Sequence, residues 1–166
     1  MEIKDYIVNM ARYAKEASRE LSLISPTTKN KALCHMADGL LSSANFIIKE
    51  NQKDLQLARK KRLPPVLIDR LLLNERCIKA MSDSLRIIAH LADPVAKVMR
   101  AWKRPNGLLI KKVRVPIGVI CIIYESRPNV TSDCAGLCLK AGNAVILRGG
   151  SEALNSNLAI YKIIKG

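Results

Sequence analysis

The chain has 166 residues, a length that suits one domain, and 49% of them are hydrophobic, enough to build a core. Its net charge of +14 points to anionic partners such as nucleic acid, a membrane surface or anionic metabolites, but no apolar run reaches the length of a membrane span. The five cysteines are odd in number and form no C-x-x-C pair, so we expect reduced thiols rather than a disulfide framework. The N-terminus lacks the apolar core of a signal peptide, so we expect a cytoplasmic protein.

Residues 1–95 form a helical segment. Apolar residues recur in it at helical spacing, and two polar residues, Ser25 and Asn74, stand where helix N-caps are expected. Pro26 follows Ser25 at the first helical position, where proline is favoured. The predicted helices cover residues 2–22, 26–42, 44–60, 66–72 and 75–91.

Residues 97–114 are a basic segment that contains seven Lys or Arg residues and no acidic residue. The turn signal Pro105-Asn106-Gly107 separates an arm that contains Trp102 from an expected strand over 108–113, so we predict a β-hairpin. A solvated basic ribbon without a partner is an open interpretation of this pattern.

Residues 115–166 show a strand–helix–strand–helix pattern. Apolar runs over 117–124 and 144–147 flank a helical pattern over 131–141 that Gly142 ends, and a further helix opens at 151. Because a helix connects the two strands, we expect them to be parallel, and their almost uninterrupted apolar composition predicts helices on both sheet faces. The sequence therefore predicts an α/β fold: a helical half, a β-hairpin arm and a parallel βαβα unit.

The carboxyl ends of the two strands carry the candidate binding residues. Ligands of open parallel sheets bind at these ends, and both loops lead into helix N-termini, which favour anions. A G-x-G-x-x-G fingerprint is absent, so ordinary structural turns explain the pattern equally well. The residues concerned are Glu125, Ser126, Arg127 and Asn129 after the first strand, and Arg148, Gly149, Gly150, Ser151 and Glu152 after the second.

The run PIGVICIIYESRPNVTSDCAGLCLKAGNAVILRGGSEALNSN, with LIDRLLL and RPNGLLIKKVRVPIGV upstream, resembles the γ-glutamyl phosphate reductase (glutamate semialdehyde dehydrogenase) family. This family is a branch of the aldehyde dehydrogenase superfamily, and ESRPNVT together with KAGNAVILRGG is specific to the branch. The resemblance covers essentially the whole chain. It implies that residues 1–166 are the N-terminal part of an aldehyde-dehydrogenase-like NAD(P)-binding domain, apparently truncated.

The function that the resemblance implies is the NADPH-dependent reduction of γ-glutamyl phosphate to glutamate semialdehyde in proline biosynthesis. It also implies a homo-oligomer whose subunits meet through the 97–114 arm. Arg148 stands where the superfamily has a lysine that contacts the adenosine ribose or its phosphate, and an arginine suits the 2′-phosphate of NADPH. Arg127 is implied to meet the substrate's carboxylate or phosphate, and Asn129 to donate to an oxyanion. Further cofactor contacts are implied for Glu125, Ser126, Gly149, Gly150, Ser151 and Glu152.

Structural ion pairs are the competing interpretation of the two arginines. In that interpretation Arg127 pairs with Glu125, and Arg148 pairs with Glu152 to hold a helix start. Neither arginine would then be available to a ligand.

No catalytic residue is predicted within the chain. The resemblance implies that a cysteine thiolate attacks the acyl phosphate before NADPH delivers hydride, and none of the five cysteines matches that cysteine's motif. We expect the nucleophile beyond Gly166 and therefore expect the chain alone to be inactive. Cys134 and Cys138, four residues apart on a helix, are expected core residues, and a metal site would need more ligands than they offer.

Two alternatives to the reductase remain open. The first is a non-catalytic remnant that serves binding or assembly. The second is a nucleic-acid-binding module, which the charge of +14 and the basic ribbon favour. The absence of a nucleic-acid motif and of aromatic residues between the basic ones argues against this module.

Overall fold

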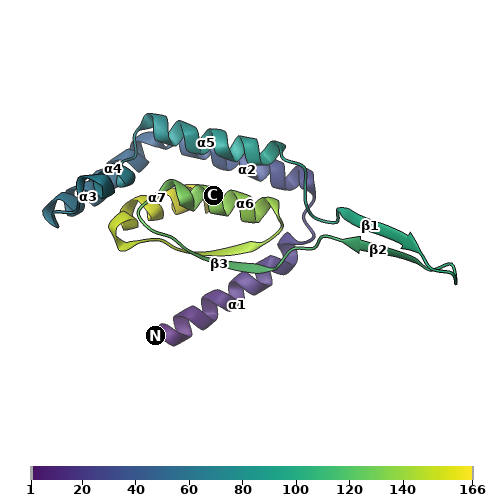
Figure 1. Ribbon diagram of the computed structural model, residues 1–166. Coiled ribbons are helices and arrows are strands. Elements are labelled where there is room, and N and C mark those ends of the chain that lie inside the picture. Colours follow the sequence, from purple (N-terminus) through teal and green to yellow (C-terminus); the bar gives the residue numbers. More distant parts are fainter. Residues whose placement is uncertain (1, 166) are drawn as a thin grey trace.

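The computed structural model describes residues 2–165, and its elements follow in the predicted order (Figure 1). The α/β fold class is confirmed: a helical half, a hairpin and a βαβα unit succeed one another. The helical half consists of α1 (Ile3–Leu21), α2 (Pro26–Ser42), α3 (Ala44–Lys60), α4 (Pro65–Leu71) and α5 (Glu75–His90). The rest consists of β1 (Val98–Lys103), β2 (Leu109–Val113), β3 (Val119–Ile123), α6 (Asn129–Lys140), β4 (Ala144–Arg148), the 3-10 turn η1 (Ser151–Ala153) and α7 (Leu154–Lys165).

Local signals set the ends of these helices. The side chains of Ser25 and Asn74 accept hydrogen bonds from backbone N–H groups three residues ahead, which caps α2 and α5 as predicted. Gly142, at φ +72°, ends α6, and the N–H of Asn143 reaches back to the carbonyl of Cys138 at 2.8 Å. No helix within residues 2–165 is long and apolar enough to cross a membrane.

The main core lies between the helices. The helices α2 and α5 run side by side, and α6 and α7 pack beneath them (Figure 1). The most buried residues of this core are Leu33, Ala37, Leu40, Ile47, Leu73, Ile78, Met81, Leu85, Ile88, Ala89 and Ile160. This helical layer fixes α6 and α7, whose N-terminal ends follow β3 and β4.

The strands β3 and β4 pair in parallel, in a register that runs from Val119 opposite Ala144 to Ile123 opposite Arg148. Helix α6 lies above β3 in Figure 1, and α1, which contacts β4 and β3, lies below. The prediction that helices cover both sheet faces is wrong for the outer part of β3, where Ile123 is 73% exposed and Cys121 is also exposed. The reason is that α1 packs chiefly against β4 and leaves the end of β3 uncovered.

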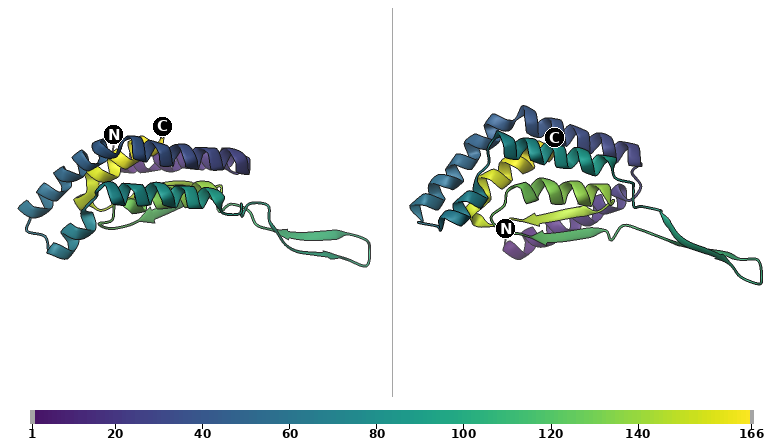
Figure 2. Two further views of the ribbon diagram at one scale, coloured as in Figure 1. Left: turned by 90° about the horizontal axis from the view of Figure 1, so that it is seen from above. Right: turned by 45° about the horizontal axis from the view of Figure 1, so that its top comes forward.

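The predicted hairpin is confirmed. Strands β1 and β2 are antiparallel, with Trp102 opposite Ile110, and Gly107 supplies the positive φ, +88°, that the turn requires. The hairpin extends away from the body of the molecule as a long arm (Figure 2). Of its two strands, only Trp102 and Ile110 are half-buried; the other residues are exposed.

Candidate functional site

The parallel register brings the predicted site residues to one edge of the sheet. Ile123 and Arg148 are partners at the carboxyl ends of β3 and β4, and the N–H of Tyr124 donates to the carbonyl of Arg148 at 3.0 Å. The elbow 125–129 and the loop 148–152 therefore leave the sheet side by side. All nine residues predicted from the sequence lie in these two adjacent segments, which run from the ends of β3 and β4 into the first residues of α6 and η1.

Ser126 and Glu152 join the two loops. The backbone N–H and the hydroxyl of Ser126 both donate to Oε1 of Glu152, at 3.1 Å and 2.8 Å. The pKa of Glu152 is lowered, chiefly because its carboxylate accepts a hydrogen bond from the backbone N–H of Glu152 itself. Burial opposes the decrease. The bonds from Ser126 and the positive charge of Arg148 add to the decrease. Gly150 packs tightly on this carboxylate, since a Cβ atom at position 150 would lie 2.2 Å from Glu152 Oε1.

A second polar chain supports the loop after β4 from below. The Thr131 hydroxyl donates to Asn157 Oδ1 at 3.1 Å, so the hydroxyl of Tyr124, 2.7 Å away, is the donor to Thr131. A Cβ atom at Gly149 would lie 2.2 Å from Asn157 Nδ2 and 3.1 Å from the Tyr124 hydroxyl. Sequence reasoning missed these three polar residues, because Tyr124 closes an apolar run and the other two lie on separate helices without a local signal.

The two arginines of the site are exposed, and the competing ion pairs do not form. Three ion pairs occur within residues 2–165, and neither Arg127 nor Arg148 belongs to one. Asn129 lies in the first turn of α6, where its amide donates to Asp133 Oδ2 at 3.1 Å. Burial raises the pKa of Asp133, and this bond from Asn129 opposes the rise. The edge thus presents two exposed cations that form no ion pair within residues 2–165.

The two cysteines of α6 lack the environment of an activated nucleophile. Burial raises the pKa of both Cys134 and Cys138, and nearby ionisable groups raise it further. A thiol is nucleophilic as its thiolate, which these surroundings disfavour. Within residues 2–165, no group of three or more His, Cys, Asp or Glu side chains could hold a metal ion.

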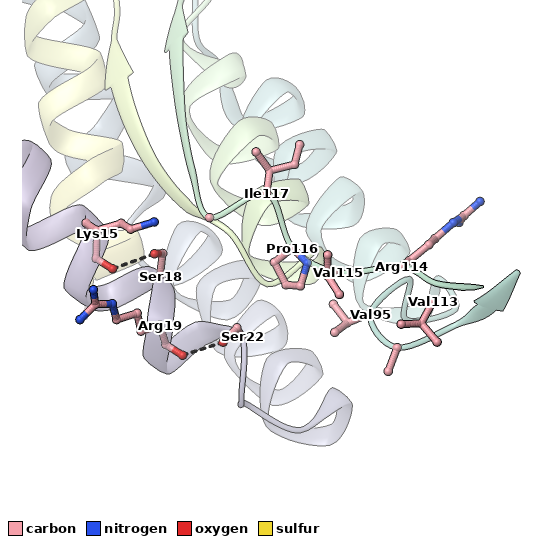
Figure 3. Close-up of a pocket in the computed structure, with 12 residues that line it drawn as sticks. Lys15, Ser18, Arg19, Ser22, Val95, Val113, Arg114, Val115, Pro116 and Ile117 are labelled. Carbon is pink, nitrogen blue, oxygen red and sulfur yellow. Dashed lines mark hydrogen bonds between the residues drawn. The ribbon is translucent and has the colours of Figure 1, made fainter. Parts of the chain in front are cut away.

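A pocket of about 460 Å³ lies at the other end of β3 (Figure 3). Its walls are the basic side of α1, with Lys15 and Arg19, and the segment 113–118 that leads from the arm to the sheet and is apolar apart from Arg114. Because Gly118 precedes β3, this pocket is at the amino end of the strands and is separate from the two loops described above.

No protein-family model matches the chain. A γ-glutamyl phosphate reductase of Clostridium novyi (strain NT) is 54% identical over 164 residues, which cover 99% of this chain and 39% of the relative. One of Caldanaerobacter subterraneus subsp. tengcongensis is 58% identical over 154 residues, 93% of this chain and 37% of the relative. The resemblance to γ-glutamyl phosphate reductases is confirmed.

Solved structures agree with this sequence similarity. The crystal structure of γ-glutamyl phosphate reductase from Thermotoga maritima superposes with a TM-score of 0.93 at 43% identity, covering 95% of this chain and 38% of that one. The Saccharomyces cerevisiae γ-glutamyl phosphate reductase gives 0.90 at 34% identity, with 94% and 40% covered. A probable aldehyde dehydrogenase from Listeria monocytogenes, 17% identical with a TM-score of 0.67, shares the fold. The chain spans about two fifths of the length of the γ-glutamyl phosphate reductases that it matches.

Proposed function

We propose that the chain supplies the cofactor-binding loops of an NADPH-dependent γ-glutamyl phosphate reductase, an enzyme that forms glutamate semialdehyde for proline biosynthesis. The observation that carries this proposal is the pair of exposed arginines at the carboxyl edge of β3 and β4, which form no ion pair with any residue from 2 to 165. NADPH and an acyl phosphate are both polyanions, and a guanidinium binds phosphate through a planar, two-point contact. The name carried by the similar proteins specifies the phosphorylated substrate and the reduction.

The two loops divide the work in this proposal. Arg148 takes the 2′-phosphate of the cofactor, while the backbone of Gly149, Gly150 and Ser151 lies along its adenosine half. The elbow faces the reacting end: Arg127 binds the carboxylate or phosphate of the substrate. Bound NADPH supplies the hydride.

Two further elbow residues complete the proposed site. Glu125 contacts the cofactor, and Asn129, at the first turn of α6, offers its amide to a developing oxyanion once it leaves Asp133. Ser126 and Glu152 also belong to the proposed cofactor site, and the hydrogen bonds between them bear on how they act.

The chain alone binds the cofactor in this proposal but does not reduce the substrate. Burial raises the pKa of both α6 thiols, which disfavours the nucleophilic thiolate at Cys134 and Cys138. The arm, residues 97–114, serves contact between subunits of a homo-oligomer. Residues 2–95 and 115–165 together form the globular part that holds the loops.

An NMR titration of the ¹⁵N-labelled chain with NADPH tests the binding proposal. We expect amide shifts concentrated in residues 125–129 and 148–152. A parallel assay with enzymatically generated γ-glutamyl phosphate should show no protein-dependent oxidation of NADPH. Shifts confined to the arm, or a spectrum unchanged at saturating NADPH, would overturn the binding role; oxidation of NADPH would overturn the proposed inactivity.

A further inference from the structure

The carboxylate of Glu152 is engaged by the protein itself. One of its oxygens, Oε1, receives both donors of Ser126, and the Gly150 backbone lies directly against the same group. Ser126 is 7% exposed, so its bonds to Glu152 are largely screened from water. Hydrogen bonds to a charged acceptor are stronger than neutral ones, and loss of the acceptor leaves buried donors unsatisfied.

This contact joins the elbow to the 148–152 loop through side chain as well as backbone. Arg127 follows Ser126 directly, and its side chain is exposed. Within the elbow, the backbone N–H of Arg127 donates to the carbonyl of Glu125 at 2.6 Å. Glu152 lies 26 residues further along the chain, in η1, directly beyond the loop that carries Arg148. The Ser126–Glu152 contact therefore adds a second link between the segments that carry the two exposed arginines, beyond the backbone bond from Tyr124 to Arg148.

We infer that Glu152 is a positioning residue that acts through Ser126, holding the elbow against the 148–152 loop so that Arg127 and Arg148 face one bound polyanion. This inference rests on the proposed function and gives Glu152 a role other than direct contact with the ribose of the cofactor. The rival role is that direct contact, in which the Glu152 carboxylate turns toward a ribose hydroxyl and Ser126 is incidental.

Amide hydrogen exchange in the 166-residue chain tests without a ligand whether the contact holds the elbow locally, which the positioning role requires. In Glu152→Ala the Ser126 N–H loses its acceptor, so we expect its exchange to rise about tenfold to a hundredfold, as the loss of a charge-assisted bond implies. Glu152→Gln keeps an oxygen acceptor in place and should raise exchange by less than about tenfold. Exchange in the core of α5 should stay at the wild-type rate. Faster exchange throughout the chain would mean that Glu152 serves the whole fold, and would overturn the positioning role.

Cofactor affinity supplies the second measurement. NADPH dissociation constants are compared for wild type, Ser126→Ala, Glu152→Ala and the double variant, with exposed Glu16→Gln on α1 as the control for a lost carboxylate. If Glu152 acts through Ser126, the double variant should lose less affinity than the product of the two single fold-losses. Glu152→Gln should retain most of the affinity of the wild type.

Either of two results overturns the inference: wild-type exchange at Ser126 in Glu152→Ala, or single fold-losses that multiply in the double variant. Failure of the proposed function is recognised separately. A wild-type chain that does not bind NADPH removes the cofactor role, and the contact between the loops then stands or falls on the exchange of Ser126 alone.

Discussion

Arg148 ends β4 with an exposed guanidinium and no carboxylate partner within residues 2–165. Its backbone is held from the other strand, because its carbonyl accepts the N–H of Tyr124. The residue is thus fixed at its backbone while its side chain extends from the edge. Selective recognition of one additional phosphate requires a cation whose backbone is held in place and whose side chain is free to bind.

Replacement of Arg148 by alanine should therefore weaken NADPH much more than NADH. A charge-assisted phosphate bond is worth on the order of 1.5–3 kcal/mol, which corresponds to a loss of roughly tenfold to somewhat above a hundredfold in NADPH affinity. NADH lacks the 2′-phosphate and should lose little. Both dissociation constants are measured for wild type, Arg148→Ala and the control Arg59→Ala, at the exposed end of α3. Equal losses for both cofactors in Arg148→Ala would reject the 2′-phosphate role.

At the scale of elements, the position of α6 depends on its close approach to α5. Gly136 faces α5 so closely that a Cβ atom there would lie 2.6 Å from Leu85 Cδ2 and 3.3 Å from Ile88 Cδ1. Leu85 is fully buried, so its side chain has little space to move aside. The helix that begins at the elbow is therefore fixed by a contact at its middle.

Gly136→Ala should destabilise the chain by about 1–2 kcal/mol, because overpacking outweighs the gain in helix propensity. Gly39→Ala on α2 is the matched control: it makes the same change, but its Cβ meets only half-buried Ile163, at 3.1 Å from Cγ2. Thermal unfolding of both variants provides the comparison, and Gly136→Ala should melt at the lower temperature by at least about 2 °C. Similar melting temperatures would show that α5 and α6 separate without cost.

The arm is the other element that needs an explanation. A two-stranded hairpin is marginally stable alone, and this one exposes Met99, Leu108 and Leu109 to about half of their area or more. The guanidinium of Arg100 lies over the Trp102 ring at 5.3 Å, so the single aromatic of the arm is already occupied by its own chain. These features favour a protein partner over stacked nucleic-acid bases.

We therefore expect the arm to mediate self-association and to leave nucleic acid only weakly bound at physiological salt. Leu109→Asp combined with Val98→Asp should lower the association constant in sedimentation equilibrium. Neutralising Lys103, Arg104, Lys111 and Lys112 to glutamine should change nucleic-acid binding no more than neutralising Arg59, Lys60, Lys61 and Lys79 does, because both sets remove the same charge. Tight, salt-sensitive binding that only the arm variant loses would favour the nucleic-acid module instead.

Local sequence signals predicted the elements well but not the contacts that hold the site. Ser25, Asn74 and Gly142 act on neighbours in sequence, so spacing alone revealed their roles. By contrast, the carboxylate of Asp54 in α3 accepts the backbone N–H groups of Asn155 and Ser156 at the start of α7, 101 and 102 residues away. Such a cap, like the Ser126–Glu152 contact, depends on tertiary packing that no local pattern encodes.

At the scale of the whole molecule, one buried charged cluster joins the helical half, the segment that precedes the arm and the βαβα unit. Lys29 of α2 forms an ion pair with Asp93, which precedes the arm, and donates to the carbonyl of Lys140 at the end of α6. Lys140 in turn donates to Asn30 at 2.6 Å and to the carbonyl of Ala89 at 2.9 Å. The carboxylate of Asp93 thus pairs with buried Lys29, and its charge also acts on buried Lys140.

The cluster makes stability depend on pH in a definite direction. Burial tends to raise the pKa of Asp93, but the bonds from Lys29 and Val95 and the charges of Lys29 and Lys140 outweigh it, so the pKa is lowered. Burial lowers the pKa of Lys140, since it disfavours the charged ammonium group. The negative charge of Asp93 opposes this decrease, and the positive charge of Lys29 adds to it. Because folding lowers the pKa of Asp93, its contribution is fully present above the unfolded-state value and is lost as the pH falls through the folded-state value.

Asp93→Asn should therefore lower the free energy of unfolding by about 3 kcal/mol at neutral pH, since it leaves two buried ammonium groups without a carboxylate. The difference from wild type should begin to shrink as the pH falls below about 4, the unfolded-state pKa of Asp, and should vanish as the pH falls through the lower folded-state pKa, where Asp93 of the folded wild type becomes protonated as well. Urea unfolding of both proteins across this range measures the effect, with exposed Asp83→Asn on α5 as the control. A deficit that stays constant with pH, or one no larger than that of Asp83→Asn, would mean that the cluster contributes packing alone and that its charges do not tie the arm to the helices.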